Sequence, residues 1–329
     1  MHSIDGIHHI TLITGDAPAN VDFYVRVLGL RLVKKTVNQD DPSVYHLYYA
    51  DEAGSPGADI TFFEYPGAQR GEAGAGMVSS IIHRVGSQAA LDFWEERLAG
   101  EGVTTIRQDS HLVFSDPEGM SHELGVFTVP DRPLVGRSAG VPPEFALQGF
   151  EAVRALVRDP ARSQALVREA LGFRELGANE WEARGENRGG RILFEATDRL
   201  GRPGAGTVHH IAWAVFRDEM EEWRNRVIAV GGHPTSIIDR FYFESVYFRE
   251  PSGILFELAT FDGAGFAVDE PAETLGETLA LPPDFEPLRS QIEPNLTPVP
   301  DIRHWRPAPA PATDPAPATA PASAPAPAT

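Results

Sequence analysis

The sequence predicts an α+β fold built from four repeated βαβββ units, and two observations predict it. Distant stretches repeat one another: residues 75–80 match residues 205–210, residues 116–124 match residues 250–258, and a weaker match joins residues 6–64 to residues 149–195. Each unit also has the same internal order, in which an apolar strand is followed by a helix and then by three short strands. A Rossmann fold is excluded because it would need strands and helices to alternate throughout.

The four units are expected at residues 4–66, 74–128, 147–197 and 205–261. In the second and fourth units, apolar residues at helical spacing predict helices over 89–98 and 218–230, and glycines at 102 and 231–232 end them. Residues 128–146 are rich in Pro and Gly and predict a linker.

The end of the chain differs from the repeats. Residues 262–305 mix turn signals with one short helix expected near residues 285–292. Residues 306–329 are nearly all Pro and Ala, which predicts a disordered, polyproline-like tail with little to bury against a core.

Composition excludes several classes of protein. The formal net charge is -19, from 28 Lys and Arg against 47 Asp and Glu, which disfavours nucleic acid and anionic membranes as partners. The absence of cysteine excludes disulfides, thiolate metal sites and cysteine nucleophiles. Neither a long apolar run nor a signal-peptide pattern occurs, so we expect no membrane association and a cytoplasmic location.

Two histidine pairs are the strongest chemical signal. His8-His9 and His209-His210 open the first strands of units one and four, whereas the other two units have Ser79-Ser80 and Glu151-Ala152 there. A single histidine in a buried strand is usually structural, but two matched pairs indicate metal ligation by neutral imidazole. Because ligands must meet at one ion, units one and four should form one barrel. Units two and three should form the other, a scaffold without those ligands.

This arrangement resembles the vicinal oxygen chelate superfamily, which includes glyoxalases, bleomycin resistance proteins and dioxygenases. Four motifs, at residues 6–11, 208–212, 242–249 and 253–257, are similar to those of hydroquinone-type ring-cleaving dioxygenases. A fifth segment, at residues 45–51, is also similar to a segment of that family. The resemblance covers about residues 4–300 and omits the tail.

The resemblance implies a metal site of two histidines and one carboxylate, namely His9, His210 and Glu257. Such a set leaves one side of the ion open for substrate and O2, and Fe(II) is the metal implied. Mn(II) remains an alternative, and zinc would not support the redox step. Glu64 is a further candidate, since repeat symmetry predicts it at the fourth corner of the same barrel.

Four neighbouring residues are candidates for catalytic roles. Tyr247 and Arg240 match family positions close to the substrate, where they could hydrogen-bond a phenolic hydroxyl and stabilise its anion. A surface salt bridge is the alternative for Arg240. Strand alternation predicts that His8 and His209 point away from the ligand faces, and their roles are either structural or in support of the ligands and proton transfer.

The resemblance therefore implies a non-haem Fe(II) dioxygenase that cleaves the ring of a hydroquinone or related phenol with O2. One alternative is a glyoxalase-like isomerase or lyase that uses the metal as a Lewis acid. The other is a non-catalytic protein that binds a small aromatic ligand, and retention of all three ligands argues against it.

Overall fold

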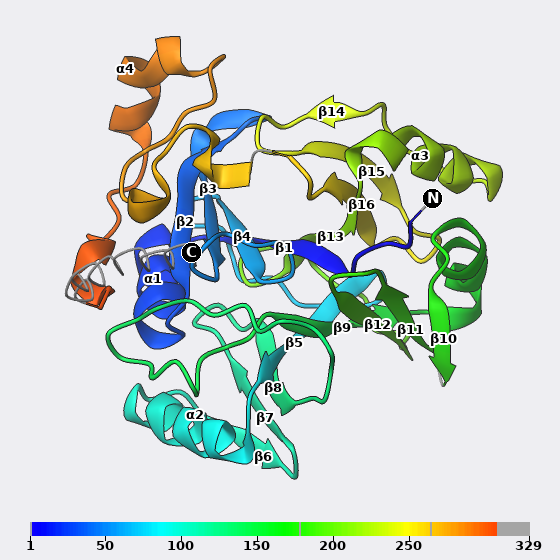
Figure 1. Cartoon of the computed structure of the whole chain (residues 1–329), viewed down its shortest axis with the longest axis horizontal. Coiled ribbons are helices and arrows are strands. Elements are labelled where there is room, and N and C mark those ends of the chain that lie inside the picture. Colours follow the sequence, from blue (N-terminus) through cyan, green and yellow to red (C-terminus); the bar gives the residue numbers. More distant parts are fainter. Residues whose placement is uncertain (1, 178, 264, 308–329) are drawn as a thin grey trace, which may run out of the picture.

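The computed structural model describes residues 2–177, 179–263 and 265–307, and nearly all of the predicted Pro/Ala tail lies outside these ranges. Within them, the strands form two eight-stranded sheets (Figure 1). None of the described helices is long and apolar enough to cross a membrane.

The first sheet joins the first and fourth units, as predicted. Its order is β14-β15-β16-β13-β1-β4-β3-β2, with the antiparallel pair β1–β13 at its centre. The strands of the first unit are β1 (Ile7–Thr14), β2 (Arg31–Asn38), β3 (Asp41–Ala50) and β4 (Asp59–Glu64). Those of the fourth are β13 (Val208–Val215), β14 (Ile238–Asp239), β15 (Glu244–Arg249) and β16 (Leu255–Thr260).

The second sheet joins the second and third units in the same way, in the order β10-β11-β12-β9-β5-β8-β7-β6. The second unit contributes β5 (Met77–Val85), β6 (Ile106–Gln108), β7 (His111–Ser115) and β8 (Ser121–Val126). The third contributes β9 (Phe150–Val157), β10 (Arg174–Gly177), β11 (Glu180–Arg184) and β12 (Gly189–Ala196). The predicted pairing of units, one with four and two with three, is confirmed.

Each unit places its helical segment between its first two strands. The segments are α1 (Ala17–Val21) with a π-helix over Asp22–Val27, α2 (Gln88–Gly100), a 3-10 turn at Pro160–Ser163 with a π-helix over Ala165–Ala170, and a 3-10 turn at Arg217–Glu219 with α3 (Met220–Ala229). Asp16 and Ser87 cap α1 and α2 by accepting hydrogen bonds from the backbone N–H of Ala19 and Ala90. Beyond β16 the chain forms α4 (Arg289–Ile292) and several short 3-10 turns.

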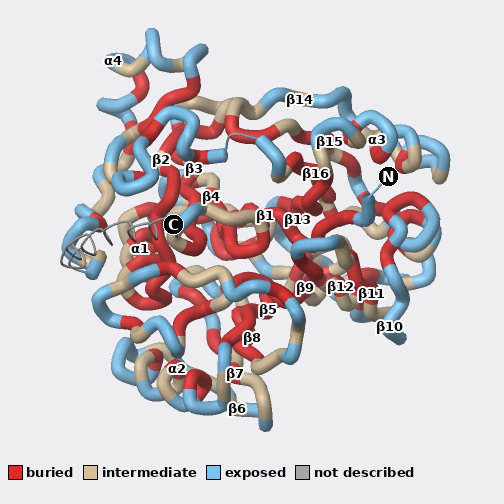
Figure 2. Tube along the Cα trace, viewed as in Figure 1, coloured by how far each residue is buried: buried red, intermediate tan, exposed pale blue. Residues whose placement is uncertain are grey.

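Helical segments connect the two sheets. Tyr24 stacks on Tyr49 of the first sheet and meets His122 of the second edge-on, and its hydroxyl donates to Asp116 at 3.0 Å. Ser163 makes the corresponding contact in the other half of the molecule, where it donates to Glu250 at 2.6 Å. The central strands and these contacts are buried, whereas β14 and much of α4 are exposed (Figure 2).

The second barrel holds an ion pair at the place that corresponds to the predicted metal site. Glu123 is the register partner of Ile82, just as Glu257 is the partner of Ala212. The Arg154 guanidinium donates to both carboxylate oxygens of Glu123, at 3.1 and 3.3 Å. The positive charge of Arg154 therefore balances the negative charge of Glu123, as expected of a scaffold barrel that lacks the histidines.

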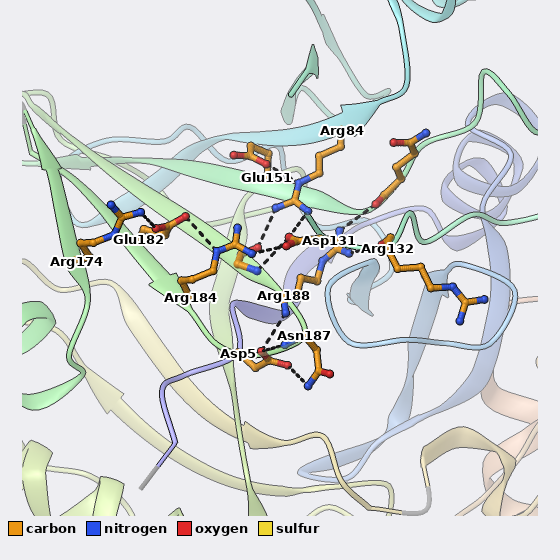
Figure 3. A network of polar contacts seen from close by, with 12 residues as sticks. Asp5, Arg84, Asp131, Arg132, Glu151, Arg174, Glu182, Arg184, Asn187 and Arg188 are labelled. Carbon is orange, nitrogen blue, oxygen red and sulfur yellow. Dashed lines mark hydrogen bonds and ion pairs between the residues drawn. The ribbon is translucent and has the colours of Figure 1, made fainter. Parts of the chain in front are cut away.

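A buried polar network extends from this barrel to the first unit (Figure 3). Arg84 donates to Asp131 and Glu151, each at 2.5 Å. Asp5, which precedes β1, accepts a hydrogen bond from the backbone N–H of Arg188 at 3.0 Å. The network thus fixes the start of β1 against the second barrel.

Lys34 holds the C-terminal segment on the first sheet. Its side chain is fully buried on β2, and its ammonium group pairs with Asp269 at 2.6 Å and with Glu270. The same ammonium lies 5.0 Å from the ring centroid of Tyr242, whose hydroxyl also donates to Asp269. One cation therefore links β2, the C-terminal segment and the loop before β15.

We predict that Lys34→Met lowers the free energy of unfolding by about 3 kcal/mol, because two carboxylates lose their buried cation. Urea denaturation of the variant and the wild type measures this difference. Lys35→Met is the matched control, since within the described residues the Lys35 ammonium bonds to a backbone carbonyl, that of Glu277, and to no carboxylate. Equal losses in the two variants would contradict the assigned role of Lys34.

Candidate metal centre

Two β-bulges position the histidines of the central strand pair. In β1, Ile7 pairs with Trp213 and His9 with Ala212, so His8 is an extra residue. In β13, Thr11 pairs with His210 and Leu12 with Val208, so His209 is the extra residue. A bulge interrupts the alternation of side chains and can turn one of them toward a site.

The bulges correct one prediction about the histidine pairs. Strand alternation predicted that His8 and His209 point away from their neighbours, but His8 Nδ1 lies 2.9 Å from His9 Nδ1. The same arrangement recurs in β13, with 2.8 Å between the Nδ1 atoms of His209 and His210. Each first histidine therefore supports the ring of the second, whose Nε2 is directed to the interior of the barrel.

The structure brings together the three predicted ligands, His9, His210 and Glu257, and all three are buried. Glu257 Oε2 lies 3.2 Å from His9 Nε2 and 2.9 Å from His210 Nε2, and the two nitrogens are 3.2 Å apart. Glu257 Oε2 has no hydrogen-bond partner in the described part of the chain. Three potential donor atoms thus converge on one point inside the barrel.

The spacing of these atoms fits a metal ion. Three neighbouring ligands of an octahedral ion at about 2.1 Å would be about 3.0 Å apart, whereas tetrahedral ligands would be about 3.4 Å apart. The observed distances of 2.9–3.2 Å are close to these values, so the three atoms are close enough together to be ligands of one ion.

The surroundings of the centre lower the pKa of three of its histidines and of Glu257. Burial lowers the pKa of His210, and it lowers the pKa of His8 to about 3 and of His209 to about 4. Burial acts in the opposite direction on Glu257, but the adjacent imidazoles hold its pKa well below its usual value. Ser245 is fully buried and donates to Glu257 Oε1 at 2.5 Å, which leaves Oε2 directed at the histidines.

The fourth corner of the barrel is occupied by Thr61 and not by Glu64. Thr11 pairs with Thr61 in the same way that Ala212 pairs with Glu257, so Thr61 takes the equivalent position on β4. Glu64 lies three residues further along the strand, where it accepts a hydrogen bond from the backbone N–H of Ala17 at 3.3 Å. The expectation that repeat symmetry places Glu64 at this corner was wrong, because the Phe-Phe-Glu pattern does not reveal the strand register.

His46 on β3 is part of the site, although sequence analysis assigned it no role. Its Nε2 lies 2.9 Å from Thr61 Oγ1 and its Nδ1 lies 2.7 Å from the Tyr48 hydroxyl. Burial keeps the pKa of His46 well below its usual value, so the ring is neutral. His46 on β3 corresponds to Ser245 on β15, because each lies two residues before a tyrosine of the site, Tyr48 or Tyr247. This correspondence becomes visible only when the register of both hairpins is known.

A small cavity lies beside the ligands, and Arg240 and Tyr247 are among the residues that line it. The others are His9, Asn38, Gln39, Asp40, His46, Tyr48, Phe63, His210 and Phe243. Burial raises the pKa of Tyr247 well above its usual value, so its hydroxyl remains a donor. The Arg240 guanidinium lies 5.4 Å from the Tyr247 ring centroid and pairs with Asp40, so the salt bridge that was the alternative for Arg240 is present, while its role toward a substrate stays a prediction.

The fold and this centre define a class of protein that sequence comparison also identifies. The model of the Glyoxalase/Bleomycin resistance protein/Dioxygenase superfamily matches residues 6–124 and 149–258. The chain belongs to this superfamily. Glyoxalase I from Zea mays shares the fold, with a TM-score of 0.55 at 15% identity over 78% of this chain and 92% of its own.

More similar relatives bear the names of dioxygenases. MhqA of Bacillus subtilis, named as a ring-cleaving dioxygenase, is 40% identical over 90% of this chain and 99% of its own length. Chlorohydroquinone/hydroquinone 1,2-dioxygenase of Sphingobium indicum is 32% identical, with 88% and 95% covered. A crystal structure of a Bacillus subtilis protein named as a dioxygenase superposes with a TM-score of 0.82 at 39% identity, covering 91% of this chain and 99% of its own.

We predict that Glu257→Ala abolishes stable binding of a divalent metal, because the site falls to two protein ligands. Ser245→Ala should retain one ion per chain but weaken its affinity by about 10- to 100-fold, since the carboxylate loses its orienting hydrogen bond. Metal content after anaerobic loading and desalting, together with competition against a chelator, measures both effects. Glu64→Ala is the matched control, and loss of metal in that variant would contradict the geometry described here.

Proposed function

We propose that this protein is an Fe(II)-dependent, extradiol-type dioxygenase that cleaves the ring of a hydroquinone or a related phenol with O2. The observation that carries the proposal is the convergence of His9, His210 and Glu257 at 2.9–3.2 Å beside a cavity lined by Tyr247 and Arg240. The names of the relatives support ring cleavage as the reaction and hydroquinones as the substrate class.

Bound Fe(II) would supply redox chemistry and free positions on one face for the two reactants. Iron and manganese both accept two imidazoles and a carboxylate, and iron is proposed because the reaction activates O2. The residues of the chain provide the remaining functions, which are to hold the metal, orient the phenol and exclude bulk water.

Tyr247 and Arg240 are proposed to act on the phenolic oxygen. Tyr247 remains protonated and can donate a hydrogen bond to that oxygen, while the permanently charged Arg240 stabilises the anion left when the phenol loses its proton. His8 and His209 are neutral and touch the ligand rings through Nδ1, so they are proposed to orient the ligands and to accept or return a proton there.

Aromatic side chains that line the cavity suit an aromatic ring. Phe243 packs 5.3 Å from His9, and Phe63 packs 4.3 Å from His46, between ring centroids. Tyr48 and His46 add neutral polar groups to this wall. A ring held between these aromatic faces would present one hydroxyl to the metal.

The glyoxalase-like alternative is less well supported by the geometry. A quartet of ligands was expected for that branch, with Glu64 as the fourth member. Thr61 takes that corner instead, and its hydroxyl is engaged by His46 and Thr11. Three ligands on one face leave the coordination positions that a dioxygenase needs for two reactants.

The test of the proposed function is oxygen uptake by anaerobically Fe(II)-loaded protein given hydroquinone, chlorohydroquinone, catechol and phenol. We expect stoichiometric O2 consumption with the hydroquinones and a ring-opened product that is heavier than the substrate by both oxygen atoms. An isomerase or a binding protein would consume no O2. Iron-loaded protein that binds the phenols without oxygen uptake would contradict the proposal.

Tyr247→Phe should retain fold and iron content but lower turnover by on the order of 10²-fold, because one donor to the phenolic oxygen is lost. Steady-state oxygen uptake measures this effect. Tyr45→Phe is a suitable control, since Tyr45 lies on β3 but packs in the hydrophobic core. Full activity of Tyr247→Phe across the panel would show that Tyr247 is a packing residue.

A further inference from the structure

The cavity beside the metal ligands is too small for an aromatic ring. Its volume is about 30 Å³, which is room for about one water molecule. A cavity that accepts benzene has a volume of about 150 Å³. Some of the residues that line the cavity must therefore move before a phenol can reach the centre.

Most of the cavity wall cannot move easily. His46, Tyr48 and Phe63 lie on β3 and β4, and Tyr247 lies on β15, each a strand with hydrogen-bonded neighbours on both sides. Phe243 is buried against the histidines, and the hydroxyl of the adjacent Tyr242 is fixed to Asp269. Gln39, Asp40 and Arg240 line the cavity from outside the strands, so we infer that they are the part of the wall that moves.

These two segments are joined directly above the cavity. Arg240 Nη1 and Nη2 donate to the two carboxylate oxygens of Asp40, each at 3.0 Å. Gln39 Nε2 donates to the backbone carbonyl of Arg240 at 2.7 Å. The partners are about 200 residues apart in the chain and come from the first and fourth units, so the contact joins the two units at the cavity wall.

The backbone next to Arg240 also indicates a constrained loop. Phe241 has φ of +68°, a left-handed conformation that is unfavourable for an aromatic residue. Its N–H donates to Asp239 at 2.7 Å. The contacts with Gln39 and Asp40 thus hold a loop whose local conformation is strained.

We propose that Gln39 and Asp40 are positioning residues that latch Arg240 over the metal centre and release it when a phenol enters. This inference rests on the proposed function for the nature of the ligand. The carboxylate of Asp40 and the anionic oxygen of the phenol compete for one guanidinium. Asp40 therefore keeps Arg240 beside Tyr247 in the free protein and sets the rate at which the centre opens.

The experiment follows binding of 4-nitrophenol to anaerobic, Fe(II)-loaded protein by stopped-flow absorbance. Asp40→Asn should raise the association rate by about 3- to 5-fold, the range expected when an ion pair at the surface is removed. Gln39→Ala should raise the rate by a smaller factor. Increasing NaCl should accelerate binding to the wild type but not to Asp40→Asn, because salt weakens the latch only where it exists.

Asp41→Asn is the matched control, since in the described part of the chain the Asp41 carboxylate bonds to Ser43 alone and the change of net charge is the same. It should bind at the wild-type rate with the wild-type salt dependence. A rate for Asp40→Asn equal to or below that of the wild type, or no binding to either protein, would overturn the latch.

The two proposals can fail separately. Binding is measured without O2, so a faster Asp40→Asn supports the latch even if no oxygen uptake is found. Oxygen uptake with hydroquinone, together with an unchanged binding rate in Asp40→Asn, would leave the proposed function intact and remove the latch alone.

Discussion

The antiparallel pairing of β1 with β13 is the contact on which the rest of the structure depends. It joins the first and last of four units, so residues about 200 positions apart become neighbours in one sheet. The pair carries two bulges, and each bulge turns a histidine pair so that one ring faces the barrel and the other supports it. Without this pairing the two imidazoles would belong to different barrels. Glu257, on the strand next to β13, would then have a single histidine partner.

The same pairing in the second barrel has a different chemical outcome. There the residues at the histidine positions are small or acidic, and Arg154 places its own positive charge on Glu123. In the second barrel a guanidinium occupies the position that the proposed metal ion would occupy in the first. Hydroxyl groups of Tyr24 and Ser163, each donating to a buried carboxylate of a different unit, fix the halves to each other.

The fold and the ligands were predictable because their signals are local. Repeats and strand order appear directly in the sequence, and the positions of His9 and His210 imply which units must pair. The other features of the site depend on the strand register, which cannot be read from the sequence. Only the strand register reveals the two bulges and the position of Thr61 in place of Glu64. The contact of His46 with Thr61 also depends on it. The salt bridge between Asp40 and Arg240 joins two loops, for which no periodic pattern exists.

The central claim is that one metal ion binds where His9, His210 and Glu257 converge and that its free face is directed to the cavity of Tyr247 and Arg240. Anomalous diffraction at the iron edge from crystals grown with Fe(II) tests this claim most directly. The account predicts one peak per chain, about 2.1 Å from His9 Nε2, His210 Nε2 and Glu257 Oε2. A peak elsewhere, such as beside Glu123 in the second barrel, or iron-containing crystals without a peak at the three residues, would contradict it.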